Sequence, residues 1–350
     1  NNDCAPYLRR INAAAEPPAL SAMSCREARM NFLQSFITRV FYAATLLPAV
    51  LVLNFSLIHL APGDVADTIA QSMGGADATV MAEIRADYGL DQPYIIQLGS
   101  YIGKVMQMDL GYSFFYNESV TDLILQRLPA TLLLVVLAQI LALFIGVLLG
   151  VISAQNPNGL ISHFVTFLAL FGYAAPVFWT GILLLIGFSL NIHWFPVAGM
   201  REVTVSGGFW VHFVDVVRHL VLPMLTLSSI FIALYSRQSR TAMIHELESD
   251  YVRTAIAKGL SQRAVVYRHA LKNSLSPVIT LAGLQFSAVI SGAVLVETVF
   301  SWPGLGTLAF QSIIARDTPT ILGILFFSTL VVVVGNLLTD LALRLVNPRI

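Results

Sequence analysis

The chain has 350 residues, of which 56% are hydrophobic and only 11% are charged, and its formal net charge is zero. Soluble globular domains carry about 25% charged residues, so this composition excludes an ordinary soluble protein and predicts one that lies in a membrane. The zero net charge gives no basis for nucleic-acid binding, and the two cysteines, Cys4 and Cys25, indicate neither a disulfide framework nor a metal site.

Six apolar stretches are long enough, or nearly long enough, to cross a bilayer, which takes roughly 20 predominantly apolar residues. Residues 1–29 precede them as an N-terminal extension to which we assign no role. The segment 30–61 is predicted to hold a cytoplasmic start and the first span. The predicted spans are approximately 40–61, 130–153, 164–190, 219–236, 277–298 and 319–342. The sequence therefore predicts an all-α integral membrane protein with six transmembrane helices.

Five prolines bear on the ends and the regularity of these helices. Pro129, Pro277 and Pro319 fall where predicted spans begin, the position at which a missing N–H costs least. Pro176 and Pro223 fall inside spans and are expected to kink or break them. Irregular backbone at membrane depth is tolerated only against protein or a water-filled cavity.

Small residues recur at four-residue spacing in two of the spans. Gly146 and Gly150 form such a step in the second span, and Gly283, Ser287 and Ser291 form a longer stripe in the fifth. Stripes of this kind allow two helices to approach closely in lipid. For the fifth span the sequence leaves two interpretations open, which are helix packing and the lining of a pathway.

The segment 62–129, between the first two spans, is predicted to be an external helical segment. It carries three basic and nine acidic residues. A short helix is expected over 78–88 and an amphipathic helix over 94–108, where apolar residues recur on one face. Two roles remain open, a lid on the membrane surface and a contact with a delivered ligand or its carrier.

The segment 237–272 has the opposite charge balance, with seven Lys and Arg residues against three acidic residues. Basic loops favour the cytoplasmic side of a membrane. This asymmetry places 237–272 in the cytoplasm and 62–129 outside. With six spans, both termini are then cytoplasmic.

Motifs for autonomous energy conversion are absent from the sequence. There is no GxxxxGK[ST] loop that would cradle ATP phosphates, so the chain is not expected to be an enzyme. The spans also lack Asp, Glu, Lys or Arg at mid-depth, groups that ion-driven carriers usually need. Energy is therefore expected from a partner. A stand-alone secondary transporter or channel is the alternative, and a structural membrane protein is a further one.

A polar helix is expected within the basic loop, over 249–260. Ala255 and Gly259 lie one turn apart and are expected to form a bare patch against which another protein can sit. Tyr251 lies on the same face as Ala255 at a spacing of four residues. This composition is also typical of a solvated helix. The order of the residues is therefore needed to distinguish a helix that binds a partner from a solvated one.

That order resembles the cytoplasmic "EAA" coupling loop of binding-protein-dependent ABC importer permeases. Three stretches of this loop are similar in sequence to the dipeptide/oligopeptide/nickel branch. They are Asp-Tyr-Val-Arg-Thr-Ala over 250–255, Ala-Lys-Gly-Leu over 257–260 and Arg-His-Ala-Leu-Lys-Asn over 268–273. Arg253 stands where the general pattern has Glu, and Lys272 where it has Pro. A second motif, Glu-Thr-Val-Phe-Ser-Trp-Pro-Gly-Leu-Gly over 297–306, resembles the same branch.

Taken alone, the second motif has an ordinary explanation. Trp302 is a residue type typical of the membrane interface, and Pro303 with Gly304 predicts a turn after the fifth span. The ordered match over ten residues is not explained by those general needs, and the resemblance as a whole covers residues 30–350.

The resemblance implies a type I ABC importer permease fold, with residues 130–350 as the permease core and 237–276 as the coupling loop. It implies a transmembrane permease subunit in a bacterial inner membrane that forms half of a pathway for peptides, or for nickel or small chelates. The implied partners are membrane lipid, a second homologous permease, two ABC ATPase subunits and an extracytoplasmic solute-binding protein. ATP and Mg would be held by the ATPases, and no cofactor is expected on this chain.

The site residues that follow from this resemblance fall into three groups. The ATPase-coupling residues are Asp250, Tyr251, Ala255, Gly259 and Leu260. The extracytoplasmic motif residues are Glu297, Trp302, Pro303, Gly304 and Gly306. The candidates for the translocation pathway, on the fifth span, are Gln285, Ser287 and Ser291.

Overall fold

A computed structural model describes residues 45, 47–56, 79, 82, 85, 91–202, 204 and 206–346. The chain separates into two compact units, Asn1–Leu53 and Asn54–Ile350, and each is considered by itself. The first unit contributes part of a short apolar helix, Leu47–Ser56. The rest of the predicted span 40–61, and most of the predicted helix 78–88, lie outside the described residues.

Among the described residues of the second unit, the regular structure is helical apart from one small hairpin. Its helices and strands are α5 (Tyr94–Met106), β1 (Tyr112–Ser113), β2 (Glu118–Ser119), α6 (Val120–Gln155), α7 (Leu160–Ala174), α8 (Val177–Leu184), η1 (Leu185–Asn191), α9 (Phe209–Leu247), α10 (Asp250–Ala257), α11 (Gln262–Ala264), η2 (Val265–Ala270), α12 (Leu271–Leu284), α13 (Phe286–Val299), α14 (Leu305–Ala315) and α15 (Thr318–Val346). β1 and β2 pair in antiparallel fashion. The hairpin and α14 were not predicted from the sequence.

Three helices, α6, α9 and α15, are each long and apolar enough to cross a membrane. Two bent pairs bring the count to five among the described residues. They are α7 with α8–η1, bent by 107°, and the stretch Gln262–Leu284 with α13, bent by 54°. The predicted spans from the second to the sixth are thus all found as helices.

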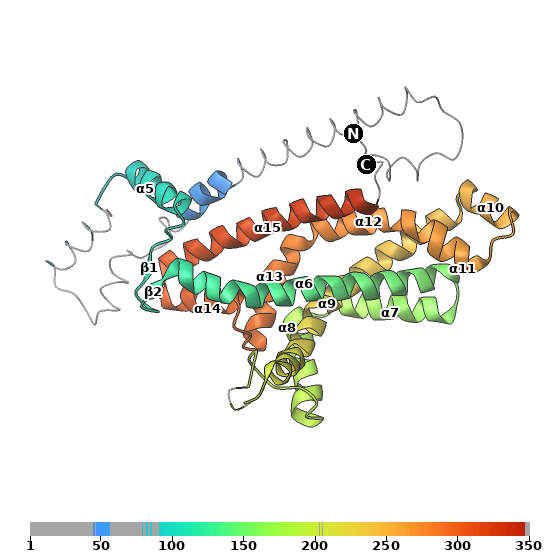
Figure 1. The fold of residues 1–350 in the computed structure, drawn as a ribbon, viewed down its shortest axis with the longest axis horizontal. Helices are drawn as coiled ribbons and strands as arrows, with labels where there is room; N and C mark the ends of the chain where they lie inside the picture. The colour runs from blue at the N-terminus through green and yellow to red at the C-terminus, as the bar shows by residue number, and fades with distance from the viewer. Residues whose placement is uncertain are drawn as a thin grey trace, which may run out of the picture. The chain divides into compact units, whose positions relative to one another are not determined.

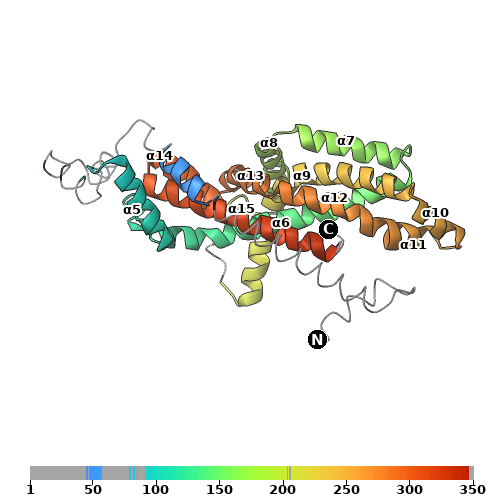
Figure 2. The same ribbon diagram turned by 90° about the horizontal axis from the view of Figure 1, so that it is seen from above.

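Helix α9 lies at the centre of the bundle. It packs against α6, α7, α8 and α12, and α12 packs in turn against α15 (Figures 1 and 2). Gly146 and Gly150 set the close approach of α6 to α9. A Cβ on Gly150 would lie 2.5 Å from Cβ of Ser239, and one on Gly146 would lie 2.7 Å from Cβ of Tyr235. The small-residue step in the second span is therefore a packing surface.

The prolines only partly behave as predicted. The chain breaks at Pro176, where Ala175 leaves the helix with an extended backbone, as the residue before a proline prefers. Pro223 does not break α9, which continues through it. Pro129 and Pro277 lie inside α6 and α12 instead of at their starts. The predicted starts at Pro129 and Pro277 were wrong because the helices begin earlier, α6 at Val120 and α12 at Leu271. The predicted break at Pro223 was wrong because this proline is buried in α9, where neighbouring helices support the backbone at the missing hydrogen bond.

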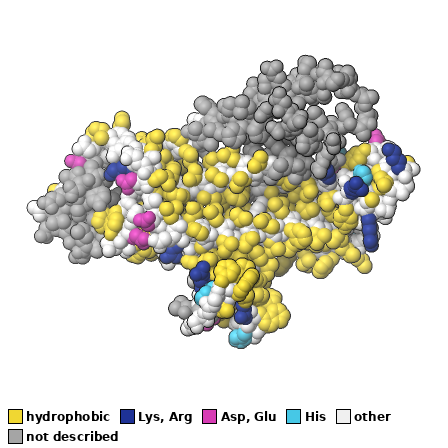
Figure 3. All heavy atoms as spheres, in the orientation of Figure 1, with side chains coloured by type: hydrophobic (Ala, Val, Ile, Leu, Met, Phe, Trp, Pro, Cys, Tyr) yellow, Lys and Arg dark blue, Asp and Glu magenta, His cyan; other side chains and the backbone are white. Residues whose placement is uncertain are grey.

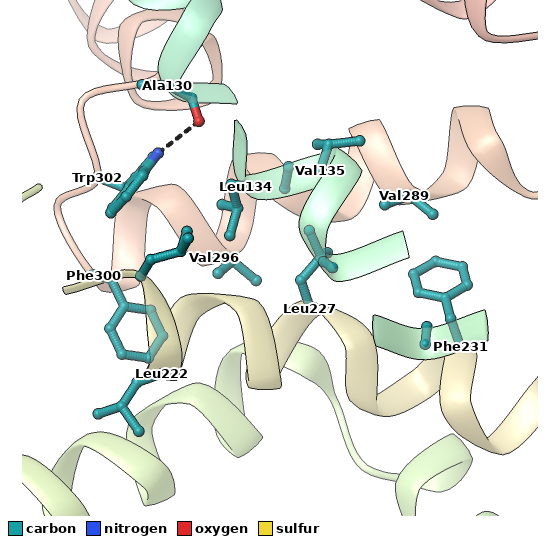
Figure 4. Packing of buried hydrophobic residues seen from close by; sticks show 14 of the residues in the cluster. Ala130, Leu134, Val135, Leu222, Leu227, Phe231, Val289, Val296, Phe300 and Trp302 are labelled. Atoms are coloured by element: carbon teal, nitrogen blue, oxygen red, sulfur yellow. Dashed lines mark hydrogen bonds between the residues drawn. The ribbon is translucent and has the colours of Figure 1, made fainter. Parts of the chain in front are cut away.

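The face of the second unit seen in Figure 3 is apolar over most of its middle, and its two ends differ in charge. Acidic side chains gather near α5 and the hairpin, and Lys and Arg side chains gather around α10 and α11. The main core lies in the middle, where α6, α9 and α13 bury Leu134, Leu227 and Val289 against one another (Figure 4).

Candidate functional site

Helix α10 is a short helix with well-defined ends. Ser249 precedes it with an extended backbone, and Asp250 stands in its first turn, where a negative charge is favourable. Gly259 ends it with φ +79°. Its N–H donates to the carbonyl of Ile256 at 2.9 Å, and the N–H of Leu260 donates to the carbonyl of Ala255 at 3.3 Å. This is the left-handed glycine termination of a helix, so Gly259 has a conformational reason for its place.

The inner face of α10 packs against its own chain. Val252 is 1% exposed and Ala255 is 7% exposed, and both join a cluster with Val151, Met243 and Val266. The expectation that Ala255 and Gly259 share a bare outer face is therefore wrong for Ala255. The physical reason is that α10 is amphipathic, and its apolar side packs against η2 in a cluster that also takes in the ends of α6 and α9.

The outer face of α10 exposes apolar side chains at the basic end of the molecule. Tyr251, Ile256 and Leu260 are exposed to 39%, 59% and 40%. The Tyr251 hydroxyl donates a hydrogen bond to Oε2 of Glu246 at 2.5 Å. Burial, and then this hydrogen bond, raise the pKa of Tyr251, so its hydroxyl remains a donor. Sequence reasoning missed Ile256, although an isoleucine within a polar helix was a usable signal.

The second predicted motif folds into a buried arrangement that we name the Glu297 clasp, formed by Glu297, Thr131 and the first turn of α14. Glu297, near the end of α13, is fully buried. Its carboxylate accepts hydrogen bonds from the Thr131 hydroxyl at 2.6 Å and from the backbone N–H groups of Gly306 and Thr307 at 2.7 and 3.2 Å. The Thr131 hydroxyl oxygen accepts the N–H of Leu305 at 2.7 Å. Three otherwise unpaired N–H groups of a helix start are thus satisfied.

The turn before α14 fixes Trp302 and Pro303. Trp302 is fully buried, and its Nε1–H donates to the carbonyl of Ala130 at 2.9 Å (Figure 4). The expectation of an interfacial Trp302 was wrong, because the ring joins the core beside Leu134 and Val296. The half-buried Pro303 is the central residue of a tight turn that the N–H of Gly304 closes on the carbonyl of Trp302 at 2.8 Å.

Both glycines of the motif are needed for close approach. A Cβ on Gly304 would overlap the carboxylate of Glu297, and one on Gly306 would lie 2.5 Å from Cα of Val294. The cavity beside Glu297 has a volume of only about 40 Å³, which is room for little more than one water. The clasp therefore joins α6, α13 and α14 and has no room for a ligand. No role was predicted for Thr131.

The small-residue stripe of the fifth span is divided by the bend between α12 and α13. Gly283 faces α15, where an added Cβ would overlap the side chain of Thr339. Ser287 and Ser291 lie beyond the bend and are exposed. Gln285 lies at the bend itself and lines a hollow of about 300 Å³. Gly283 is therefore a packing residue, whereas Gln285, Ser287 and Ser291 face open space.

A further buried acid, which carried no predicted role, holds the hairpin. Asp317, just before α15, accepts hydrogen bonds on Oδ2 from the hydroxyls of Ser113 at 2.5 Å and Thr320 at 2.6 Å. The Tyr116 hydroxyl donates to Oε1 of Gln311 on α14 at 3.1 Å. The β1–β2 hairpin is therefore fixed to the α14–α15 connection.

Comparison with known proteins agrees with this arrangement. Residues 146–350 match the family described as "Binding-protein-dependent transport system inner membrane component", and residues 32–135 match the N-terminal part of the membrane component of such systems. The chain is 37% identical over 316 residues to the oligopeptide transport system permease protein AppB of Bacillus subtilis, which covers 90% of this chain and 98% of that relative. It is 40% identical over 316 residues to the di/tripeptide transport system permease protein DppB of Pseudomonas aeruginosa, covering 86% and 94%.

A solved structure, inward-facing MetNI methionine ABC transporter, is similar in fold, with a TM-score of 0.52 and 14% identity, over 64% of this chain and 96% of that one. Together, the helical bundle and the extent of the sequence matches lead to one conclusion. The chain belongs to the family of binding-protein-dependent transport system inner membrane components.

Proposed function

We propose that this chain is one of two related permease subunits of an ATP-driven ABC importer, and that its cargo is a peptide. The observation that carries the proposal is α10, a short helix that packs against η2, in a buried cluster shared with the ends of α6 and α9, and that with the turn after it exposes Tyr251, Ile256 and Leu260. Because the chain has no phosphate-binding loop, ATP hydrolysis has to come from a separate ATPase, and that ATPase needs a surface of this kind to bind. The curated relatives AppB and DppB are named for oligopeptides and di/tripeptides, which favours peptides over nickel or small chelates.

The proposed setting is a bacterial inner membrane with six spans and both termini in the cytoplasm. The ATPase pair, which holds ATP and Mg, docks against α10 from the cytoplasm. The segment 62–129 and the Glu297 clasp lie on the opposite side, where a solute-binding protein delivers the cargo. The charge contrast between the two ends of the second unit supports this orientation.

The packing suggests how a movement at α10 reaches the other side. Val252 and Ala255 pack α10 against η2, in a buried cluster shared with the ends of α6 and α9, and Gly150 brings α6 and α9 into direct contact. At its other end, α6 holds α14 through Thr131. Closure of the ATPase pair would therefore tilt α6, α9 and α14 together and alternate the access of a pathway between the two permeases. Gln285, Ser287 and Ser291 are the proposed residues of this chain along that pathway.

Reconstitution of the complete assembly tests the proposed function. Proteoliposomes with both permeases and both ATPases should accumulate a labelled dipeptide only when ATP and the loaded binding protein are supplied. Accumulation driven by an ion gradient without the ATPases would contradict the proposal and favour a secondary transporter. Uptake of a nickel chelate but of no peptide would overturn the cargo assignment alone.

A substitution at Gly259 tests the coupling segment. Gly259→Asp is expected to leave the permease folded and inserted but to uncouple ATP hydrolysis from uptake, because a charged side chain enters the docking region. There is room for the side chain within this chain, but the φ of +79° strains most residues other than glycine.

Gly259→Asn is the matched control, since asparagine has nearly the same size, tolerates the left-handed region and is uncharged. We expect it to retain more coupled uptake than Gly259→Asp. Wild-type uptake by the aspartate variant in proteoliposomes would disprove the docking assignment.

A further inference from the structure

A hollow of about 300 Å³ lies between α7–α8, α9 and α13. Its size is at the lower end of the range for ligand pockets, about 300–1,000 Å³. Leu227 and Phe231 on α9 form part of its wall and are almost fully buried. That wall therefore belongs to the fixed core of the bundle.

Two helix breaks meet at this hollow. Tyr173 and Val177 flank the 107° break at Pro176, and Gln285 and Ala288 lie at the start of α13 beside the 54° bend. Broken helices at membrane depth are tolerated where they line a cavity, and in transport proteins they commonly form substrate sites. The convergence of both breaks on one space therefore points to a ligand.

The hollow stays open because α13 presents very small side chains to it. Ala288 and Gly292 lie one helical turn apart in the lining. A Cβ on Gly292 would already lie 3.3 Å from Cδ1 of Leu227. Larger side chains at these positions would fill the space.

The lining is apolar apart from two neutral polar side chains. None of its residues is charged, and the polar groups are the Gln285 amide and the Tyr173 hydroxyl. Within the described part of the chain, neither group makes a hydrogen bond. A few polar groups in an apolar pocket orient a ligand, and an amide offers both a donor and an acceptor, which complement a peptide unit.

We propose that this hollow is a side-chain subsite of the pathway, which takes an apolar or aromatic side chain of a transported peptide while Gln285 pairs with the adjacent peptide group. This inference rests on the proposed function. The hollow adjoins the exposed residues Ser287 and Ser291 on the same helix, which continues the proposed pathway. Two competing occupants, a side chain of the second permease and a lipid acyl chain, are outcomes of the test.

The test compares two dipeptides, Ala-Phe and Ala-Ala, in proteoliposomes that hold the complete importer, at saturating concentrations of loaded binding protein. Ala288→Phe should lower the uptake of Ala-Phe relative to Ala-Ala by about tenfold, because hydrophobic pockets discriminate side-chain size by about that factor or more. Ala288→Val should give a smaller change in the same direction. Gln285→Leu should lower the uptake of both dipeptides by a similar factor, because both present the same peptide group. Stimulation of ATP hydrolysis by the binding protein reports whether each variant assembles.

Leu295→Phe is the matched control. It enlarges an exposed apolar side chain on α13 that does not line the hollow, and it should leave the uptake ratio unchanged. Equal losses for both dipeptides in Ala288→Phe and Ala288→Val, with normal ATPase stimulation, would overturn the subsite.

Efficient cross-linking of an Ala288→Cys variant to the second permease, or labelling of that cysteine only from lipid, would also overturn it. The proposed function fails separately, if the wild-type importer moves neither dipeptide.

Discussion

Gly306 is the residue at which the Glu297 clasp comes closest to the backbone of α13. A Cβ there would lie 2.5 Å from Cα of Val294 and 2.8 Å from Oε2 of Glu297. Gly306→Ala is therefore expected to push α14 away from α13 and to lengthen the hydrogen bonds to the Glu297 carboxylate. Overpacking of this kind costs about 1–3 kcal/mol, which should appear as a lower melting temperature of the purified importer.

Gly187→Ala is the matched control, because nothing lies within 4 Å of the position its Cβ would take. It should melt within a degree or two of wild type, in line with surface substitutions that change stability by about 0.5 kcal/mol or less. If Gly306→Ala proved as stable as Gly187→Ala, the clasp would have to be looser than its geometry indicates.

At the residue scale, the sequence identified one side of the clasp but not the other. The stretch 297–306 stands out as an ordered motif, and its glycines indicated a turn. Thr131 is 166 residues away from Glu297 in the chain, and no spacing rule connects two residues so far apart. The burial of Trp302 was missed for the same reason, since the carbonyl that accepts its N–H belongs to α6.

At the element scale, α10 was predicted as a helix, but its inner and outer faces were not assigned correctly. The residue types around Ala255 allow either a docking patch or a packing face. The choice depends on Val151 and Met243, which belong to the ends of two other helices. Helix propensity and periodicity describe the helix alone, so only the tertiary arrangement shows whether Ala255 lies in a docking patch or in a packing face.

Neighbouring positions on α10 should therefore respond differently to substitution. Ala255→Leu adds volume to a buried cluster and is expected to destabilise the permease by about 1–3 kcal/mol. Ile256→Asp changes an exposed side chain and should leave the melting temperature unchanged. It should weaken binding of the purified ATPase by about tenfold or more, because central apolar contacts at interfaces contribute about 1–2 kcal/mol or more.

Thr254→Asp serves as the control for charge, because Thr254 is an exposed polar residue whose hydroxyl bonds to the carbonyl of Asp250. It should weaken ATPase binding less than Ile256→Asp. Equal effects of both aspartates would mean that charge at this end of the molecule, and not the apolar contact, decides the binding.

The helix breaks show the same limit on sequence reasoning. Pro176 and Pro223 are the same residue type inside predicted spans, yet the chain turns at one and remains helical at the other. Pro223 is buried within α9, which packs against α6, α7, α8, α12 and α13. Those contacts hold the helix together through the missing hydrogen bond. The bend at Gln285 has no proline at all and carried no signal in the sequence.

At the scale of the whole molecule, composition and charge predicted most of what the structure contains. Five of the six predicted spans correspond to long or bent helices in the described residues, because twenty apolar residues in a row leave few alternatives to a helix in lipid. The positions of those helices relative to one another could not be predicted. They depend on single contacts, such as that of Gly150 with Ser239.

The orientation of the chain in the membrane is the prediction that belongs to this scale. In a variant with Cys4 and Cys25 replaced by serine, single cysteines are introduced at Lys104 on α5 and at Lys258 after α10, both exposed positions. A membrane-impermeant maleimide added to spheroplasts should label Lys104→Cys and spare Lys258→Cys, and inside-out vesicles should give the reverse, because the basic loop is held in the cytoplasm.

Detergent-solubilised protein, in which both cysteines should react, controls for local accessibility. Three predicted spans lie between the two positions, so labelling of both from the same side would require an even number of crossings and would contradict this count. A third cysteine at Arg201, in the loop between η1 and α9, divides the interval. With spans two and three passed between Lys104 and Arg201, that residue should react from the same side as Lys104, and the fourth span should then bring Lys258 to the opposite side. Any other pattern would overturn the six-span arrangement and, with it, the placement of α10 beside a cytoplasmic motor.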